Sequence, residues 1–342
     1  DFIGCSHAVA VTNGTAALHL AALALGVKPG DKVLAPPISF VASTNCIKYC
    51  GGDVEFVDID IANYCLDLDK LESKLKNSTP GTYKGVVAVD LTGYPLDWPR
   101  LKKIAQDHKL WLIEDACHAL GAEFRDEKTW HKCGDGHYAD VSVFSFHPVK
   151  HLTTGEGGML TTNNPELAKK LKMLRTHGIT KNPQEYIKHN DGPWYHEMQT
   201  LGFNYRIPDI LCALGVSQIN RLDANIQRRQ ALATRYMQEL SGIADLELPY
   251  VENNKKHAYH LYVVLTSHRA ELFQFLAKNQ IYCQVHYIPI YKQPYYNYPS
   301  DFKLEAAESY YSRALSLPMY HGMTDDEQTY TIQKIKEFYA KT

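Results

Sequence analysis

Short apolar runs alternate with helical patterns along the first two thirds of the chain. Each run is rich in β-branched residues and ends at a turn-forming or polar residue, as buried strands do. The stretches between the runs place apolar residues at helical spacing, for example over residues 66–75. This rhythm of strand, helix and strand predicts an α/β fold with a largely parallel sheet. The predicted strands cover residues 8–11, 32–35, 54–60, 85–90, 109–115, 141–147 and 159–162.

Two helical patterns are distinctive. Residues 14–25 are apolar nearly all round and stop at Gly26, which predicts a helix buried against the sheet. Residues 209–241 predict one helix of about 30 residues, roughly 45 Å long and able to bridge two domains. Its polar side would carry Arg221, Arg228 and Arg229. Residues 178–206 before it are irregular and aromatic, which predicts a long functional loop.

The pattern changes from about residue 242. Strands are predicted over residues 259–265 and 281–287, and helices over 268–279, 304–315 and 325–339. This mixture predicts a small α+β domain. We therefore expect a large domain over residues 1–241, including the bridging helix, and a small C-terminal domain over residues 242–342.

Composition and charge exclude some classes of function. The 342 residues carry a formal charge of -2, so no basic surface for nucleic acid or an anionic membrane is expected. No apolar run reaches the length of a membrane span. Eight cysteines lie without framework spacing, as reduced thiols do in a cytoplasmic protein. We expect a cytoplasmic enzyme with no nucleic acid or membrane partner.

The most informative stretch runs from Val141 to Gly158. Its apolar strand stops at Pro148, and Lys150 follows at the carboxyl end, where α/β sheets bind ligands. Burial among apolar residues would lower the pKa of the Lys150 amine. A neutral lysine amine bonds to carbonyls, including the aldehyde of pyridoxal phosphate (PLP). The alternative is a solvated lysine just past a strand.

A second apolar run ends in the carboxylates of Glu114 and Asp115. A buried Asp is rare unless it is paired. Asp115 beneath a pyridine nitrogen would keep that nitrogen protonated and make the ring an electron sink. The alternative is an Asp115 that caps a helix beginning at Ala116.

Two further segments are candidates for contact with a ligand. Gly14 and Thr15 begin the buried helix, whose free N–H groups and positive dipole end suit a phosphate. The alternative is a plain helix cap at Asn13. Phe40 follows a strand end and could stack on a flat cofactor, although a core aromatic is the ordinary assignment.

Metal and nucleotide-loop motifs are not expected. His131, Cys133 and His137 lie close together, but their spacing fits none of the usual zinc patterns. No Gly-Lys pair occurs, which excludes a P-loop, and no G-x-G-x-x-G follows a strand. We predict no metal site.

Five motifs, in this order along the chain, resemble the DegT-type nucleotide-sugar aminotransferases. They are Asn13-Gly-Thr-Ala-Ala-Leu, Ile38-Ser-Phe-Val-Ala-Ser, Glu114-Asp-Ala-Cys-His-Ala-Leu, the segment from Phe144 to Gly158, and Gly202-Phe-Asn-Tyr-Arg. The resemblance covers essentially the whole chain. It implies the fold of aspartate aminotransferase (fold type I), with a mixed, mostly parallel central sheet, and PLP as cofactor.

The resemblance also implies roles for individual residues. Lys150 would bind PLP covalently and then move the proton, and Asp115 would bind the pyridine nitrogen. Asn204 would reach the phosphate of the partner subunit, which implies a homodimer with shared sites. The remaining cofactor contacts would be the ring contacts Phe40 and Ala116, His118 near the phenolic oxygen, and the phosphate contacts Gly14, Thr15 and Ser145.

Residues 192–199 and 285–291 narrow the resemblance. They are similar to the branch that transfers an amino group from glutamate to a UDP-linked 4-keto-6-deoxy-N-acetylhexosamine, on the way to pseudaminic acid. Enzymes of perosamine or 4-amino-4-deoxyarabinose synthesis share the five motifs and stay as alternatives. The substrate contacts implied by the resemblance are Trp194, Tyr195, His286 and Tyr287.

Two groups of relatives, the 3-dehydratases and the PLP-binding regulators, differ from the aminotransferases in function. Related 3-dehydratases have histidine at the position of Lys150, so the lysine favours transamination. Some relatives were described as PLP-binding regulators without enzyme activity, but neither charge nor a spare helix-turn-helix provides a DNA-binding part. Family members usually carry a further segment ahead of His7 that helps to cover the nucleotide-sugar, so part of the substrate contact list is left open.

Overall fold

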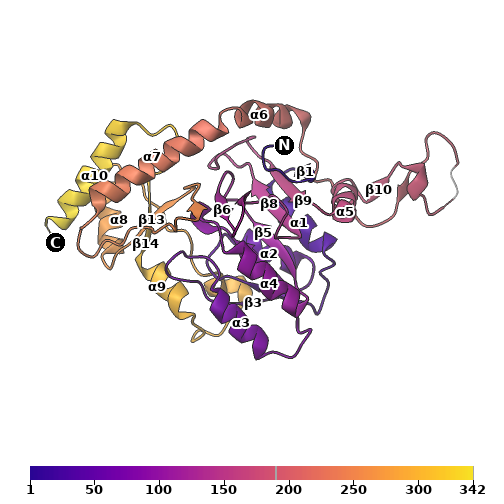
Figure 1. Ribbon diagram of the computed structural model, residues 1–342, viewed down its shortest axis with the longest axis horizontal. Helices are drawn as coiled ribbons and strands as arrows, with labels where there is room; N and C mark the ends of the chain where they lie inside the picture. Colours follow the sequence, from indigo (N-terminus) through magenta and orange to yellow (C-terminus); the bar gives the residue numbers. More distant parts are fainter. Residues whose placement is uncertain (189–190, 342) are drawn as a thin grey trace.

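A seven-stranded mixed sheet forms the centre of the computed structural model, which describes residues 1–188 and 191–341 (Figure 1). Its strands are β1 (His7–Val11), β2 (Lys32–Ala35), β3 (Asp53–Phe56), β4 (Tyr83–Val89), β5 (Trp111–Asp115), β8 (Val141–Ser145) and β9 (Gly158–Thr162). Their order is β1-β9-β8-β5-β4-β2-β3. The strands from β8 to β3 are parallel, and only β9 opposes its neighbours. The predicted α/β fold with a mixed, mostly parallel sheet is confirmed.

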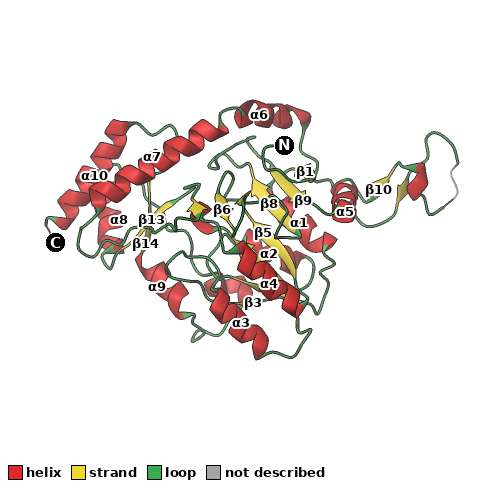
Figure 2. Ribbon diagram, in the orientation of Figure 1, coloured by secondary structure: helices red, strands yellow, loops and turns green. Residues whose placement is uncertain are grey.

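Helices cover both faces of this sheet (Figure 2). On β4, Val87 packs with α1 (Gly14–Ala24), α2 (Ala42–Tyr49) and α5 (Pro165–Arg175). Its neighbours Val86 and Ala88 pack on the other face with α3 (Leu68–Lys76) and α4 (Trp98–His108). Successive side chains of a strand point to opposite faces, so a strand covered on both faces must be apolar throughout. This explains the unbroken apolar runs.

A second, smaller core lies in the C-terminal part. It packs α7 (Leu222–Leu240), α8 (Arg269–Lys278) and α10 (Asp325–Tyr339) against the two-stranded sheet of β13 (Tyr262–Leu265) and β14 (Ala314–Leu317). Tyr262 and Val264 face this core, whereas Val263 and Leu265 face the large core, which also receives α9 (Glu305–Arg313). Residues 232–240 of α7 belong to the small core. The division at residue 241 stays a prediction.

Further short strands complete the fold. β12 (Lys255–Lys256) joins β6 (Glu123–Arg125) and β7 (Trp130–Lys132) in a three-stranded sheet. β10 (Ile179–Thr180) and β11 (Glu197–Met198) pair in a segment that projects on the right of Figure 1. We call this segment, residues 179–188 and 191–198, the arm. The Glu197 carboxylate organises this arm, because it accepts hydrogen bonds from Ile187 N, Lys188 N and the Tyr195 hydroxyl at 2.7, 2.6 and 2.9 Å. None of the described helices is both long and apolar enough to cross a membrane.

Three sequence-based expectations about these elements are wrong. The bridging helix is two helices, α6 (Asp209–Ile219) and α7, because Arg221 N bonds to Gln218 O and tightens the turn between them. β3 ends at Phe56, and beyond it the Asp58 carboxylate accepts a hydrogen bond from Ile59 N at 2.9 Å. Residues 281–287 form only one bridge, at Gln284, and β14 takes the place expected for that strand.

Arg229 is a fourth difference. The sequence pattern places it on the polar side of the bridging helix, yet its side chain is buried at 2% exposure. Its Nη1 donates to three backbone carbonyls of the C-terminal part, which offsets part of the loss of water.

Candidate active site

A cavity of about 530 Å3 opens at the carboxyl ends of the parallel strands. This is the edge at which α/β sheets bind ligands, and the volume is usual for a small-molecule site. Its lining brings together segments that are far apart in the sequence. The predicted site residues that line it are Gly14, Thr15, Phe40, Asp115, His118, Ser145, Lys150 and Tyr287.

Lys150 lies in the turn after β8, where its backbone N–H bonds to His147 O. Its Nζ is 3.4 Å from Nε2 of His260. Burial lowers the pKa of the Lys150 amine, and the electrostatic interactions with Cys117 and Asp115 oppose this only in part. A lowered pKa favours the neutral amine that carbonyl chemistry needs. The alternative of a solvated lysine does not fit this environment.

Asp115 is the last residue of β5 and is 4% exposed. The Ser43 hydroxyl donates to its Oδ2 at 2.6 Å, and Cys117 N donates to its Oδ1 at 3.2 Å. No helix begins after Asp115, since residues 116–121 form turns, so the helix-cap alternative is wrong. The carboxylate is held by donors and faces the same cavity as Lys150.

The N-terminus of α1 forms a narrow cradle beside β8. Asn13 caps the helix by accepting Ala16 N at 2.8 Å, which leaves the first N–H groups at the cavity. A Cβ at Gly14 would stand 3.0 Å from Ser145 Cβ, so only glycine leaves full room there. The hydroxyl-bearing Thr15 and Ser145 line the same corner. Free N–H groups, hydroxyls and a positive dipole end suit a phosphate.

Aromatic rings stand at the cavity mouth. Phe40 is 55% exposed, with its ring centroid 6.1 Å from that of Tyr287. The Tyr287 hydroxyl lies 3.4 Å from His118 Nε2. Burial, and then the charge of Lys150, lower the pKa of His118, so its imidazole is neutral. Ala116 is fully buried beneath the site and is not among the lining residues.

Besides Ala116, four predicted site residues do not line this cavity. Asn204 is exposed, while its neighbours Phe203 and Tyr205 pack toward His19. His286 bonds Ser316 Oγ through Nδ1 at 2.8 Å. The other two, Trp194 and Tyr195, belong to the arm.

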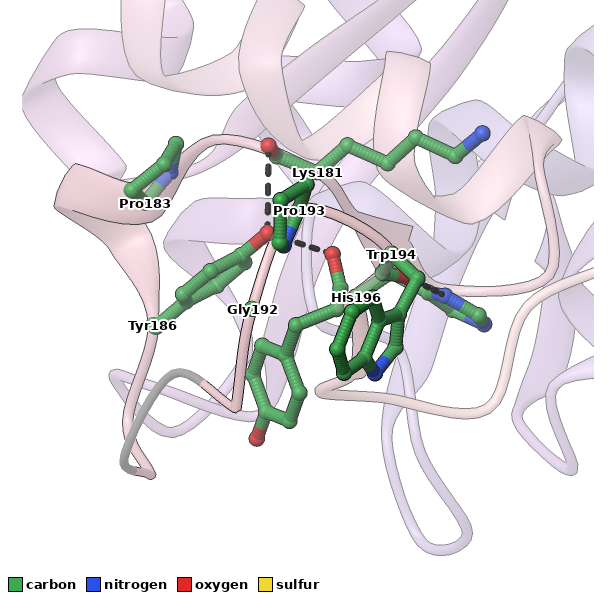
Figure 3. A pocket seen from close by; sticks show the side chains of 8 residues that line it. Lys181, Pro183, Tyr186, Gly192, Pro193, Trp194 and His196 are labelled. Carbon is green, nitrogen blue, oxygen red and sulfur yellow. Dashed lines mark hydrogen bonds between the residues drawn. The ribbon is translucent and has the colours of Figure 1, made fainter.

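The arm has a cavity of its own, of about 680 Å3 (Figure 3). Trp194 is 75% exposed on it. The Tyr186 hydroxyl donates to Tyr195 O at 2.7 Å and the two rings meet edge to face, which gives the arm a defined shape. Among the described residues, none that lines the cavity of the arm also lines the cavity at Lys150.

The cluster considered for a metal is held together by other interactions. His131 bonds Asp135 through Nδ1 at 2.8 Å and Asp126 through Nε2 at 3.1 Å. Cys133 is buried elsewhere, where its Sγ and carboxylate oxygens of Asp90 and Glu114 all lie within 4.8 Å of one another. Burial raises the pKa of Asp90 to about 6 and that of Glu114 well above its usual value. Burial favours the protonated form of both carboxyls, which are poor metal ligands in that form.

Sequence analysis missed the residues that support Asp115. Ser43 lies in the first turn of α2, and its hydroxyl is 2.7 Å from that of Ser39. Both belong to the same motif as Phe40, and their spacing of four residues, one helical turn, was the available signal. Cys117 and His260 were missed for a different reason, since only the folded chain brings them to Lys150.

Similarity to known proteins covers the whole chain. Residues 1–336 match the model of the DegT/DnrJ/EryC1/StrS aminotransferase family. The chain belongs to this family. The spore coat polysaccharide biosynthesis protein SpsC of Bacillus subtilis is 37% identical over 98% of this chain and 86% of its own length. The UDP-4-amino-4,6-dideoxy-N-acetyl-beta-L-altrosamine transaminase of Campylobacter jejuni (strain 81-176) is 35% identical over 99% and 89%. The GDP-perosamine synthase of Caulobacter vibrioides is 34% identical over 95% and 84%.

Solved structures agree with this assignment. DesV of S. venezuelae superposes with a TM-score of 0.88 at 32% identity, covering 99% of this chain and 86% of that one. PseC of Helicobacter pylori, an aminotransferase of pseudaminic acid biosynthesis, gives 0.87 at 28%, covering 100% and 89%. The family, the lysine amine, the buried carboxylate and the phosphate cradle fit one cofactor. The chain is a PLP-dependent sugar aminotransferase, and the regulator alternative is set aside.

Proposed function

We propose that this enzyme transfers the amino group of glutamate to the C4 keto group of a UDP-linked 4-keto-6-deoxy-N-acetylhexosamine, as in pseudaminic acid biosynthesis. The observation that carries the proposal is the cavity that joins Lys150, Asp115 and the Gly14 cradle. The substrate class is supported by the 35% identity to the altrosamine transaminase. The product would serve a cell-surface polysaccharide, and the reaction would take place in the cytoplasm.

Each residue around the cavity has a proposed part. The Gly14 and Thr15 N–H groups with Ser145 would hold the cofactor phosphate, and Asp115 would hold the proton on the ring nitrogen. Phe40 and Ala116 would contact the ring, and His118 would be the residue for its phenolic oxygen. The bound cofactor supplies the electron sink. The Lys150 amine carries the proton between the cofactor and the substrate carbon, for which its lowered pKa suits it.

A panel of nucleotide-sugars tests the substrate. We expect the highest kcat/KM with the UDP-linked 4-keto-6-deoxy-N-acetylhexosamine, with glutamate as donor, among UDP-, GDP- and dTDP-linked 4-keto sugars. Chromatography of the aminated product against time provides the rates, and omission of glutamate is the control. A clearly higher kcat/KM on a GDP-linked sugar would place the enzyme with the perosamine synthases, which the 34% identity to one of them makes the second candidate.

We propose further that the enzyme is a homodimer with shared sites. No residue of α6 is buried, although the helix is largely apolar and exposes Ile210 and Val216 at 78% and 69%. The neighbouring arm and the segment after it expose Trp194 and Leu201 at 75% and 74%. Apolar surface of this extent marks a protein interface. A second copy of the chain that covers this apolar surface would receive Asn204, Trp194 and Tyr195 at its own cavity. His286 and Tyr287 would come from the same chain as the cavity.

Complementation tests this geometry. Lys150→Ala and Asn204→Asp chains are each expected to be inactive, and mixing them with subunit exchange should restore activity. In a heterodimer with shared sites, one site carries both lesions and the other carries none. Random exchange would therefore recover up to about a quarter of wild-type activity in a symmetric dimer.

The outcome depends on where Asn204 acts. If it served its own chain, every site would keep one lesion. Activity that fails to return, with heterodimers demonstrated by mass spectrometry of differently tagged chains, would refute the shared site. Self-mixed Lys150→Ala chains provide the background.

A further inference from the structure

His260 is buried within the active site, although nothing in the proposed mechanism uses it. It lies two residues before β13 and is 6% exposed. Its Nε2 is 3.4 Å from Lys150 Nζ, the one hydrogen-bond contact recorded for that amine among the described residues. Its Nδ1 is buried with no hydrogen-bond partner there. A buried unsatisfied nitrogen costs free energy, so packing alone is a poor reason for a histidine here.

Three backbone contacts hold His260 in this place. Leu261 N donates to Thr92 O at 3.1 Å, and Ala258 N donates to Gly93 O at 2.9 Å. Gly93 has a φ of +100°, and a Cβ there would stand 2.7 Å from His118 O and 3.2 Å from His260 N. Glycine therefore lets the two histidine-bearing segments approach each other.

The third contact comes from α7. The Arg229 guanidinium donates to His260 O at 3.2 Å, Tyr259 O at 3.0 Å and Met319 O at 2.9 Å. Burial lowers the pKa of Arg229 to about 10, so it stays charged at neutral pH. A buried cation is costly, and here its hydrogen bond holds the backbone of His260.

Burial keeps the His260 imidazole neutral. It lowers the pKa of His260 well below the usual value, and electrostatic interactions with Lys150, His118, His151 and Arg229 lower it further. A neutral imidazole has one nitrogen that accepts a hydrogen bond. The other ionisable groups near the Lys150 amine are Asp115, Cys117, His118, His151 and His286.

We propose that His260 is a positioning residue that accepts a hydrogen bond from the Lys150 amine through Nε2 and holds the amine toward the cavity. The inference rests on the proposed role of Lys150. A lysine stem is flexible, and a fixed acceptor at the end of its reach keeps the amine in one place when it is not bonded to the cofactor.

The test measures the pKa of Lys150 in the cofactor-free protein, from the pH dependence of its reductive methylation with labelled formaldehyde. An acceptor favours the charged amine, so its removal lowers the pKa. We expect His260→Leu and His260→Phe to lower the pKa of Lys150 by about one unit or more, the equivalent of a hydrogen bond to a charged group. His260→Gln, which keeps an acceptor, should restore most of the shift.

A matched control lies in the same segment. His257 is also buried, bonds Thr92 Oγ1 through Nε2 at 3.2 Å and accepts Tyr259 N through Nδ1 at 2.8 Å. Its hydrogen bonds within the described part of the chain do not include Lys150. His257→Leu should lower the Tm and leave the pKa of Lys150 unchanged. An unchanged pKa in a folded His260→Leu or His260→Phe protein, or a shift equal to that of His257→Leu, would overturn the proposal.

A measurement on the wild-type protein guards against variants that do not fold. In histidine labelled with 15N, we expect His260 to carry its proton on Nδ1, because Nε2 must accept. A proton on Nε2 would overturn the proposal. Neither measurement needs turnover. They are therefore distinct from the test of the role of Lys150, in which borohydride fixes the cofactor and the labelled peptide is identified.

Discussion

Lys150→Ala should reduce kcat by at least about 1000-fold, because it removes both the amine that bonds to the cofactor and the group that moves the proton. The variant should still bind PLP through the cradle at Gly14, Thr15 and Ser145, since those contacts are on other elements. In the wild-type protein, the visible absorbance should show a yellow enzyme. Borohydride should then fix the cofactor to the peptide that contains Lys150.

Two variants sharpen this prediction. Lys150→Arg keeps a positive charge but cannot provide a neutral amine, so it should be as inactive as Lys150→Ala. Lys172 is exposed on α5, and Lys172→Ala should retain full activity and the yellow colour. Borohydride labelling of another lysine peptide, or turnover by Lys150→Ala near the wild-type rate, would show that the amine of this cavity is not the one that reacts.

Asp115→Asn should lower kcat by about 10- to 100-fold or more, while the cofactor still binds. The change removes the charge that keeps the ring nitrogen protonated at almost no steric cost. A hydrogen bond between charged groups contributes about 1.5–3 kcal/mol, which corresponds to that range of rate if it acts in the transition state. Single-turnover kinetics with glutamate would measure the chemical step directly.

The surroundings of Asp115 define its controls. Ser43→Ala removes the 2.6 Å hydrogen bond to Oδ2 and should give a smaller loss, because the carboxylate stays in place. Asp97→Asn changes an exposed carboxylate that caps α4. Because Asn caps a helix about as well as Asp, this variant should leave both the Tm and the chemical step nearly unchanged. A chemical step in Asp115→Asn equal to that of Asp97→Asn would mean that Asp115 has only a structural role.

Local physical rules account for most of the fold that the sequence predicts. A strand covered on both faces is apolar at every position, so β2, β4, β5 and β8 were visible as continuous runs. The predicted last helix, residues 325–339, has the bounds of α10, whose start is marked by a capping box of Thr324 and Glu327. The predictions failed where tertiary contacts decide, as at residues 281–287, which bridge only once at Gln284.

In the active site, too, some residues follow from local sequence and others only from tertiary contacts. Lys150 and Asp115 could be named from the sequence, because each follows an apolar strand and the carboxyl ends of parallel strands meet at one edge of the sheet. Arg229 could not be placed, because its helical pattern does not show that backbone carbonyls from two distant segments surround it.

The sequence by itself determined the fold class, the family and the residues at the strand ends, since these depend on neighbours within a few positions. Only the tertiary structure decided which other groups meet them. His260 lies 110 positions beyond Lys150 in the chain, and its contact with the amine exists because Arg229, Thr92 and Gly93 hold its backbone there. No local pattern records a contact that three separate segments create together.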